Sequence, residues 1–312
     1  MDFTLPFPIK QTEKQISIKQ TLLFMGSCFA EEVGNKMIER KFNTLVNPHG
    51  ILYNPNILCD AISDYIDRKI YVKEDLFQHN ELWQSFNHHG RFSDRNENIC
   101  LTSINKEIKQ AQNQLKKANW LIVTFGSAFA YINKKTNSIV ANCHKLPSSE
   151  FEKILLHKNQ IISLWSKQLA TLQKFNSNLN ILFTVSPVRY TRDGLIENNR
   201  SKGILLDVVH TLVEENSSCF YFPAYEIVID ELRDYRFFKE DLVHPNELAI
   251  NYVWEKFVNT ICDDETKKFL SEYEPLLKSL NHRPFQEETA AYQKFKKQLE
   301  EKVKIVEKKF LS

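Results

Sequence analysis

Several features that mark particular protein classes are missing from this sequence. The six cysteines form no C-x-x-C pair, which excludes a zinc ribbon or a dense disulfide framework and favours free thiols. The 41 lysines and arginines nearly balance the 39 aspartates and glutamates, so we expect no nucleic-acid or membrane partner. The apolar runs are only strand-sized and no signal-like run opens the chain, which predicts a cytoplasmic protein.

Glycine is also scarce, with seven in 312 residues. Gly26, Gly50 and Gly126 follow apolar, strand-like stretches, so we expect the backbone to require them. No G-x-S-x-G occurs, which excludes the nucleophile elbow of the α/β-hydrolases. Apolar residues make up 42% of the chain, enough for a continuous core.

Apolar runs and helical periodicity alternate along the chain. This order predicts a three-layer α/β/α fold with a mainly parallel sheet of about five strands, because parallel strands need helical crossovers that cover both faces. Strands are expected at 21–25, 42–46, 120–125, 181–185 and 220–225. Helices are expected from Phe29 onward and at 57–66, 104–118, 150–175, 202–213 and 245–258, the last with Pro245 in its first position.

Two segments depart from this alternation. Residues 73–103 are polar and aromatic without a sustained period, which predicts an irregular insertion. Residues 286–311 are rich in lysine and glutamate and predict one long helix or two. The expected organisation is a catalytic domain at 1–262 and a helical extension at 263–312.

Ser27 lies where the first predicted strand turns into a helix. At that position a hydroxyl projects at the carboxyl edge of the sheet, and the helix amino-terminus favours developing negative charge. These are the requirements of a nucleophile. The alternative is that Ser27 only caps the helix, since serine is a preferred N-cap.

Asp241 and His244 stand three residues apart, just before Pro245. One loop can therefore supply an imidazole as base and a carboxylate that fixes its tautomer, the two groups that a serine nucleophile needs. The alternative is a charge that flanks the helix and a surface histidine. The place of the pair after the last predicted strand favours the catalytic interpretation.

Three ordered motifs resemble a known family. Gly26–Ala30 reads G-S-C-F-A, 47–55 reads N-P-x-G-x-L-Y-N-P, and 141–145 reads A-N-C-H-K, as in the GSCFA family. That family is grouped with the SGNH (GDSL-like) esterases and acetylhydrolases. The resemblance, from about Leu22 to Val258, implies an SGNH/flavodoxin-like sheet.

The resemblance also implies roles for individual residues. Ser27 matches the nucleophile, Gly50 the oxyanion glycine of the second block, Gly126 the glycine of the third block, and Asp241 with His244 the last-block pair. The third block of the wider superfamily supplies an asparagine to the oxyanion, but Ser127 follows Gly126 here. Three residues remain as substitute donors: Ser127, Asn54 and Asn142.

Other residues near the predicted site are expected to have secondary roles. Cys28 is expected to point into the core as a small apolar group. His144 is expected, with His49, His88 and His89, to line a pocket rather than to bind a metal, because no pair has the i, i+4 spacing of helical ligands. Arg189 and Arg192 follow a predicted strand and are either ligands for an anionic substrate or solvated loop charges.

The sequence therefore predicts a hydrolase that cleaves an ester through an acyl-serine, without a metal or organic cofactor. The expected substrate is an acyl or O-acetyl ester on a carbohydrate or small metabolite. Two alternatives stay open: a catalytically weak binding module, because the third-block asparagine is absent, and an acyltransferase that uses the same residues.

Overall fold

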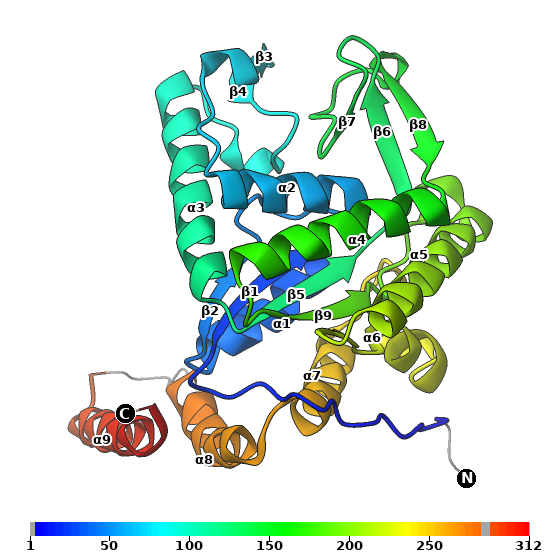
Figure 1. Cartoon of the computed structure of the whole chain (residues 1–312). Coiled ribbons are helices and arrows are strands. Elements are labelled where there is room, and N and C mark those ends of the chain that lie inside the picture. Colours follow the sequence, from blue (N-terminus) through cyan, green and yellow to red (C-terminus); the bar gives the residue numbers. More distant parts are fainter. Residues whose placement is uncertain (1–3, 282–287, 312) are drawn as a thin grey trace.

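A parallel sheet of five strands forms the centre of the molecule in the computed structural model, which describes residues 4–281 and 288–311 (Figure 1). Every adjacent pair of these strands is parallel. The strands lie in the order β10-β9-β5-β1-β2, which along the chain is 2-1-3-4-5, the order of flavodoxin-like sheets. Their bounds are β1 (Thr21–Gly26), β2 (Asn43–Val46), β5 (Trp120–Phe125), β9 (Asn180–Val185) and β10 (Cys219–Tyr221). The predicted three-layer α/β/α class is confirmed.

Helices cover both faces of the sheet (Figure 1). One core cluster joins alternate strand residues to α2, α3, α4 and α5, and the other joins the remaining strand residues to α1, α7 and α8. The long helices are α1 (Cys28–Glu39), α2 (Pro55–Asp67), α3 (Glu97–Lys117), α4 (Lys158–Phe175), α5 (Leu195–Glu215), α7 (Glu247–Ile261), α8 (Asp264–Leu280) and α9 (Ala290–Leu311). Short helical turns are α6 (Ala224–Glu226), η1 (Lys73–Asp75), η2 (Gly90–Phe92), η3 (Ser148–Glu150), η4 (Thr191–Asp193), η5 (Ile227–Glu231) and η6 (Tyr235–Phe237).

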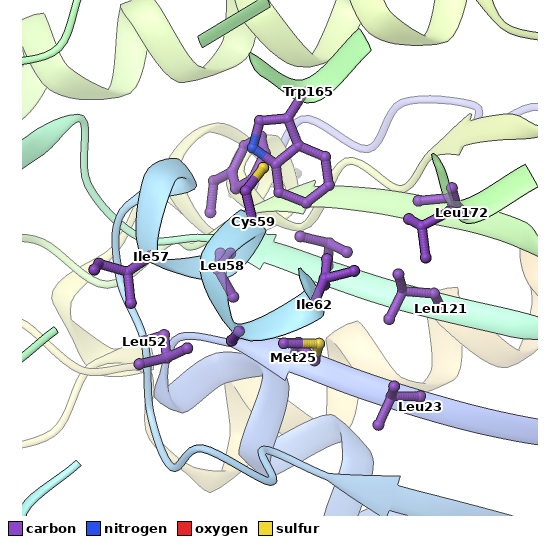
Figure 2. Packing of buried hydrophobic residues seen from close by; sticks show 14 of the residues in the cluster. Leu23, Met25, Leu52, Ile57, Leu58, Cys59, Ile62, Leu121, Trp165 and Leu172 are labelled. Atoms are coloured by element: carbon purple, nitrogen blue, oxygen red, sulfur yellow. The ribbon is translucent and has the colours of Figure 1, made fainter. Parts of the chain in front are cut away.

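Strand residues that alternate along β1 belong to different cores. Leu23 and Met25 face α2 and α4, where Trp165 packs in the layer that Figure 2 shows. Leu22 and Phe24 belong to the other cluster, with α1 and α7. Because successive side chains of a strand point to opposite faces, a strand buried on both sides has a continuous apolar run, as predicted from the sequence.

The switch point of the sheet lies at β1. The second strand along the chain, β2, pairs with one side of β1, and the third, β5, pairs with the other. In open α/β sheets the crevice for ligands forms at this point, outside the carboxyl ends of the strands. Ser27 directly follows β1 and Gly126 directly follows β5, so both lie at this crevice.

A small antiparallel sheet stands beyond the carboxyl ends of the main strands (Figure 1). Its order is β7-β6-β8, with β6 (Phe129–Asn133), β7 (Ser138–Val140) and β8 (Phe151–Leu155). The predicted helix 150–175 is wrong in its first part, because residues 151–155 pair with β6 as a strand and the helix begins only at Lys158. The sequence analysis did not predict β6 and β7.

The predicted irregular insertion is only partly irregular. It contains a two-stranded hairpin of β3 (Phe77–His79) and β4 (Leu82–Gln84). It also ends early, because Asn96 caps α3 by accepting hydrogen bonds from the backbone N–H groups of Asn98 and Ile99. Helix α3 therefore begins at Glu97 rather than at 104.

Three further boundaries differ from the prediction. Helix α5 begins at Leu195 rather than at 202. Strand β10 ends at Tyr221, and a helical turn, α6, replaces the expected continuation to Tyr225. Helix α7 begins at Glu247 with Asn246 as its cap, so Pro245 precedes the helix instead of opening it.

The carboxyl-terminal helices lie at the end of the molecule opposite to the small antiparallel sheet (Figure 1). Helix α9 packs on α8, where the ring of Phe310 meets that of Phe269. Residues 286 and 287 of the predicted segment 286–311 lie outside the described residues, and the rest is helical from Ala290. Within the described part of the chain, every helix is too short or too polar to cross a bilayer.

Candidate active site

Ser27 is positioned by a tight turn between β1 and α1. The preceding Gly26 has a φ of +135°, and a Cβ on it would lie 2.2 Å from the carbonyl oxygen of Thr124. The Gly26 N–H donates to Asn47 Oδ1 at 2.9 Å, which ties this turn to the loop after β2. Only glycine fits between β1 and β5 here, so the backbone requirement predicted for Gly26 has a direct physical cause.

The Ser27 hydroxyl is not used to cap the helix. Ser27 occupies the N-cap position of α1 but makes no side-chain capping bond. The residue is 1% exposed, and its Oγ has no hydrogen-bond partner among the described residues. Buried hydroxyls are nearly always hydrogen-bonded, but those of Thr124 and Thr184 also lack a partner among the described residues. Ser27 differs from these two because it stands at a helix amino-terminus and lines a cleft.

Asp241 and His244 form a hydrogen-bonded pair on one loop. The imidazole Nδ1 lies 2.6 Å from Asp241 Oδ2, while Oδ1 accepts from the backbone N–H groups of Val243 at 2.9 Å and His244 at 3.0 Å. These backbone bonds, followed by the His244 side chain, lower the pKa of Asp241 to about 2. An ionised carboxylate only accepts, so the Nδ1 atom of His244 carries the hydrogen and Nε2 is left free to act as a base.

Arg189 holds this loop in place. Its Nη1 donates to the Leu242 carbonyl oxygen at 3.1 Å, and its backbone N–H to that of Val243 at 3.4 Å. Its guanidinium carbon lies 4.2 Å from the centroid of the Phe238 ring. Arg189 is thus neither a solvated charge nor a free anion ligand: it positions the loop that carries His244.

Ser27 and His244 open onto the same cleft. This cleft has a volume of about 820 Å³, compared with about 660, 410 and 10 Å³ for three other hollows of the molecule. It lies between the carboxyl ends of the main strands and the small antiparallel sheet. Other predicted site residues that line it are Asn54, Gly126, Ser127, Asn142, His144 and Arg189.

Three backbone donors that could hold an oxyanion already have partners. Gly50 N–H donates to Asn47 O at 2.7 Å, and Gly50 does not line the cleft. The N–H groups of Gly126 and Ser127 both donate to Tyr53 O, at 2.8 and 3.0 Å. The Ser127 hydroxyl accepts from Phe129 N–H at 3.0 Å. None of the three backbone N–H groups is a free donor in this geometry, and the Ser127 hydroxyl lies 3.3 Å from Ser201 Oγ.

Asn54 presents a free donor. Its Oδ1 accepts from Ile57 N–H at 3.1 Å and so caps α2. Because the acceptor oxygen must face that helix, the Nδ2 amide is turned away from it, and no hydrogen bond engages it among the described residues. Asn142 also has an N–H₂ group on the cleft that no described residue engages, because its Oδ1 accepts from His144 N–H at 2.8 Å. Asn142 follows β7 of the small sheet, however, whereas Asn54 lies between β2 and α2 at the edge of the main sheet that carries Ser27.

Two models of known protein families match this sequence. Residues 21–257 match the model of the GSCFA family, which is most of the chain. The chain belongs to the GSCFA family. Residues 273–312 of this GSCFA protein match a second model, described as the GSCFA domain protein, C-terminal domain. No curated protein matches the chain.

The four histidines that were expected to line a pocket of this GSCFA protein fall into two groups. His89 and His144 line the cleft, and His144 Nε2 lies 2.8 Å from Ser85 O. His49 and His88 are buried and stacked on each other 4.2 Å apart, with His49 bonded to Tyr65 and Asp64. Residues 4–281 and 288–311 contain no cluster of three metal-ligating side chains.

Cys28 of the G-S-C-F-A turn does not enter the core, contrary to the expectation from sequence. It is half-buried and lines the cleft beside Ser27. Burial raises the pKa of its thiol, which disfavours the thiolate that a cysteine nucleophile requires. The hydroxyl of Ser27 is therefore the better candidate for covalent chemistry.

Lys202 is a site residue that the sequence analysis missed. It is 2% exposed, and its Nζ donates to Gly126 O at 2.7 Å and Ser186 O at 2.6 Å, which joins the ends of β5 and β9 beneath the cleft. Burial lowers its pKa to about 7. A signal was present, because Lys202 shares the apolar helix face of Leu205 and Val209 at i+3 and i+7.

Proposed function

We propose that this GSCFA protein is a serine hydrolase that cleaves an acyl or O-acetyl ester. One observation carries the proposal: the buried, unpaired Ser27 Oγ borders the same cleft as a His244 imidazole whose tautomer is fixed by Asp241. These are the nucleophile, base and orienting group of acyl transfer. They stand at the carboxyl ends of parallel strands, where ligands of such sheets bind.

The proposed reaction has two steps. His244 Nε2 accepts the Ser27 proton as Oγ attacks the acyl carbon, and the imidazolium then donates that proton to the leaving alcohol. A water molecule, deprotonated by the same nitrogen, attacks the acyl-serine, and the imidazolium returns this proton to Ser27 Oγ as the acid is released. Asn54 Nδ2 and the amino-terminus of α1 are the groups that would stabilise negative charge on the acyl oxygen.

We further propose that the protein belongs with the SGNH-type esterases. Ser27, Gly50 and Gly126 come after β1, β2 and β5, and the Asp-His pair comes after β10, in the order that the resemblance implies. The third-block asparagine is replaced by Ser127, whose hydroxyl is already bonded to Phe129 N–H. Asn54 would supply the missing amide from the loop before α2. The six free cysteines fit a reducing compartment such as the cytoplasm.

A catalytically weak binding module is the second candidate. It is favoured by the paired N–H groups of Gly50, Gly126 and Ser127, because loss of one oxyanion donor lowers turnover by about a hundredfold to a thousandfold. An acyltransferase would use the same residues with an alcohol in place of water.

Hydrolysis of 4-nitrophenyl acetate separates the first two candidates. The hydrolase predicts release of nitrophenolate by the wild type and its loss in the Ser27→Ala variant. Folded wild type that hydrolyses no faster than Ser27→Ala would contradict the proposal. The binding module would still be detected by a ligand that raises the melting temperature of both proteins equally.

A further inference from the structure

We propose that the alcohol part of the natural ester carries an oxyanion, a carboxylate or a phosphate, which Arg192 and Lys145 bind. This inference rests on the proposed ester hydrolysis and names its substrate class. It is carried by the charges that line the cleft, by the lack of partners for two of them among the described residues, and by the place of one of them on the segment that holds the His244 loop.

The charged lining of the cleft has a single sign. Its cationic side chains are Lys145, Arg189 and Arg192, and no aspartate or glutamate is among the described residues that line it. The chain as a whole is close to neutral, with 41 basic and 39 acidic residues. This local excess of positive charge therefore contrasts with the rest of the molecule, and a cleft lined by one sign concentrates ligands of the other.

Two of the three cations have no protein partner. Arg189 is bonded to Leu242 O, but Arg192 and Lys145 make neither an ion pair nor a side-chain hydrogen bond with any described residue. The carboxylate next to Arg192, that of Asp193, pairs instead with Lys153. A guanidinium and an ammonium thus remain available at the cleft, and both groups suit carboxylate or phosphate oxygens.

The ammonium of Lys153 is itself fully engaged. It lies 4.2 Å from the Phe129 ring centroid and 5.2 Å from that of Tyr190, in addition to its pairing with Asp193. Burial raises the pKa of the Cys143 thiol, and the positive charge of Arg192 partly offsets this rise. The guanidinium therefore lies near Cys143, which lines the cleft. Arg192 thus keeps a positive charge that is unpaired among the described residues, whereas Asp193 and Lys153 neutralise each other.

Arg192 follows Arg189, which is bonded to the His244 loop, by three residues. The segment that follows β9 carries both Arg189 and Arg192, and Arg189 binds the backbone of Leu242 and Val243 just before His244. Because His244 must donate its proton to the leaving alcohol, that alcohol lies near the His244 loop. We therefore assign to Arg192 a charge on the alcohol rather than on the acyl group.

Aromatic rings form the adjoining wall. Tyr131 and Tyr190 both line the cleft, and their hydroxyl oxygens lie 3.1 Å apart. Such a wall suits probes built on a benzene ring. Three acetyl esters differ in the charge of the alcohol: 4-acetoxyphenyl phosphate, 4-acetoxybenzoate and the neutral 4-acetoxybenzamide. Their differences in intrinsic reactivity cancel when wild type and variant are compared on the same ester. A fourth probe, 4-nitrophenyl succinate, places a carboxylate on the acyl group instead.

The experiment compares kcat/KM for these esters in the wild type and three variants. We expect a preference of about tenfold or more for an anionic alcohol over the benzamide, mainly through KM, from one charge-assisted hydrogen bond. Arg192→Ala should abolish most of this preference and Lys145→Ala part of it. Arg200→Ala is the control, since Arg200 pairs with Glu197 and does not line the cleft. The ratio of phosphate to benzoate identifies which oxyanion the site prefers.

Two other outcomes overturn the inference, and a third overturns the proposed function instead. An anionic preference that is equal in wild type and Arg192→Ala, or a preference for the succinate, overturns the inference while ester hydrolysis stands. If wild type cleaves none of the four esters, the proposed function fails instead. Melting of Ser27→Ala with 4-hydroxybenzoate or 4-hydroxyphenyl phosphate then decides: a stabilisation that Arg192→Ala removes supports the anion site, and no stabilisation overturns it.

Discussion

The two sides of the proposed catalytic site differ in how the fold holds them. Ser27 is 1% exposed, between a buried strand and a helix. The side chains of His244 and Asp241 are 43% and 47% exposed, on a loop without regular structure before α7. The proposed nucleophile is therefore fixed by the core, whereas the proposed base is fixed by a few hydrogen bonds.

This difference indicates where the two sides are vulnerable. On the Ser27 side, a change of one atom meets the backbone of the neighbouring strand, so it changes folding stability. On the His244 side, a substitution changes the orientation of the imidazole ring and leaves the core intact. No hydrogen bond joins Ser27 Oγ to His244 in the described structure, so the two groups must come closer together for proton transfer.

The largest effect is expected from Gly26→Ala on the buried side. The new Cβ would meet Thr124 O at 2.2 Å in a backbone conformation that L-residues rarely adopt, so the free energy of unfolding should fall by about 3 kcal/mol or more. Gly203→Ala is the matched control in helix α5, where a Cβ meets nothing within 4 Å. There the free energy should rise by about 0.5–1 kcal/mol. Urea unfolding measures both, and equal stability of the two variants would contradict the account.

A second effect on the buried side depends on pH. Burial lowers the pKa of Lys202 to about 7, whereas the unfolded chain keeps this proton up to its ordinary value near 10.5. Between these values the unfolded state holds more protons on this residue, so Lys202 should contribute a rise of on the order of a few kcal/mol to the unfolding free energy as the pH increases. Buried thiols such as Cys59, whose pKa is raised by burial, contribute a fall over part of this range, so the rise is measured as the difference between wild type and Lys202→Met. Lys202→Met should lack this rise.

Urea unfolding between pH 7 and pH 10 tests the behaviour of Lys202. Lys116→Met, at an exposed position of α3, serves as the control and should retain the wild-type dependence. If Lys202→Met gains stability with pH as steeply as the wild type, the ammonium is not the group that titrates.

On the exposed side, Arg189→Ala should slow catalysis without unfolding the protein. It removes the bond from Nη1 to Leu242 O and the contact with Phe238. Misplacement of a catalytic group by about 1 Å can cost up to a hundredfold, and we expect a fall in kcat of about tenfold with KM within twofold. Arg236→Ala, which removes an exposed pair with Asp234, is the control. An unchanged kcat in Arg189→Ala would show that the loop needs no clamp.

The smallest effect is expected from removal of α9. A chain that ends at Asn281 loses the contacts of Phe310 with Phe269 and of Lys309 with Glu272, at the end of the molecule opposite to the small sheet. Hydrolysis of 4-nitrophenyl acetate should stay within twofold of wild type. A truncated protein that is folded by circular dichroism but inactive would show that this extension completes the site.

Local patterns were sufficient to predict the buried side. The positions Phe29, Val33 and Met37, spaced four apart, are all buried on α1, and the apolar run of β5 is buried throughout. The segment 151–155 was misassigned because its apolar residues continue the helical spacing of α4. Its strand structure depends on pairing with β6, twenty residues earlier, which local periodicity does not contain.

The exposed side was predictable only in part. The D-x-x-H spacing predicted a pair on one loop, because a three-residue separation needs no distant contact. The clamp by Arg189 joins backbone groups more than fifty residues away, and the free amide of Asn54 depends on its capping bond to α2. Such roles follow from three-dimensional contacts, so residue type and spacing could nominate these residues but could not assign their tasks.

Covalent labelling with an uncharged fluorophosphonate, followed by peptide mapping, tests the central claim most directly. The account predicts that wild type is labelled on Ser27 alone among its serines, that Ser27→Ala is not labelled, and that folded His244→Ala reacts at least a hundredfold more slowly, because the base that activates the hydroxyl is gone. Labelling that persists in Ser27→Ala, or that proceeds at the wild-type rate in His244→Ala, would contradict it.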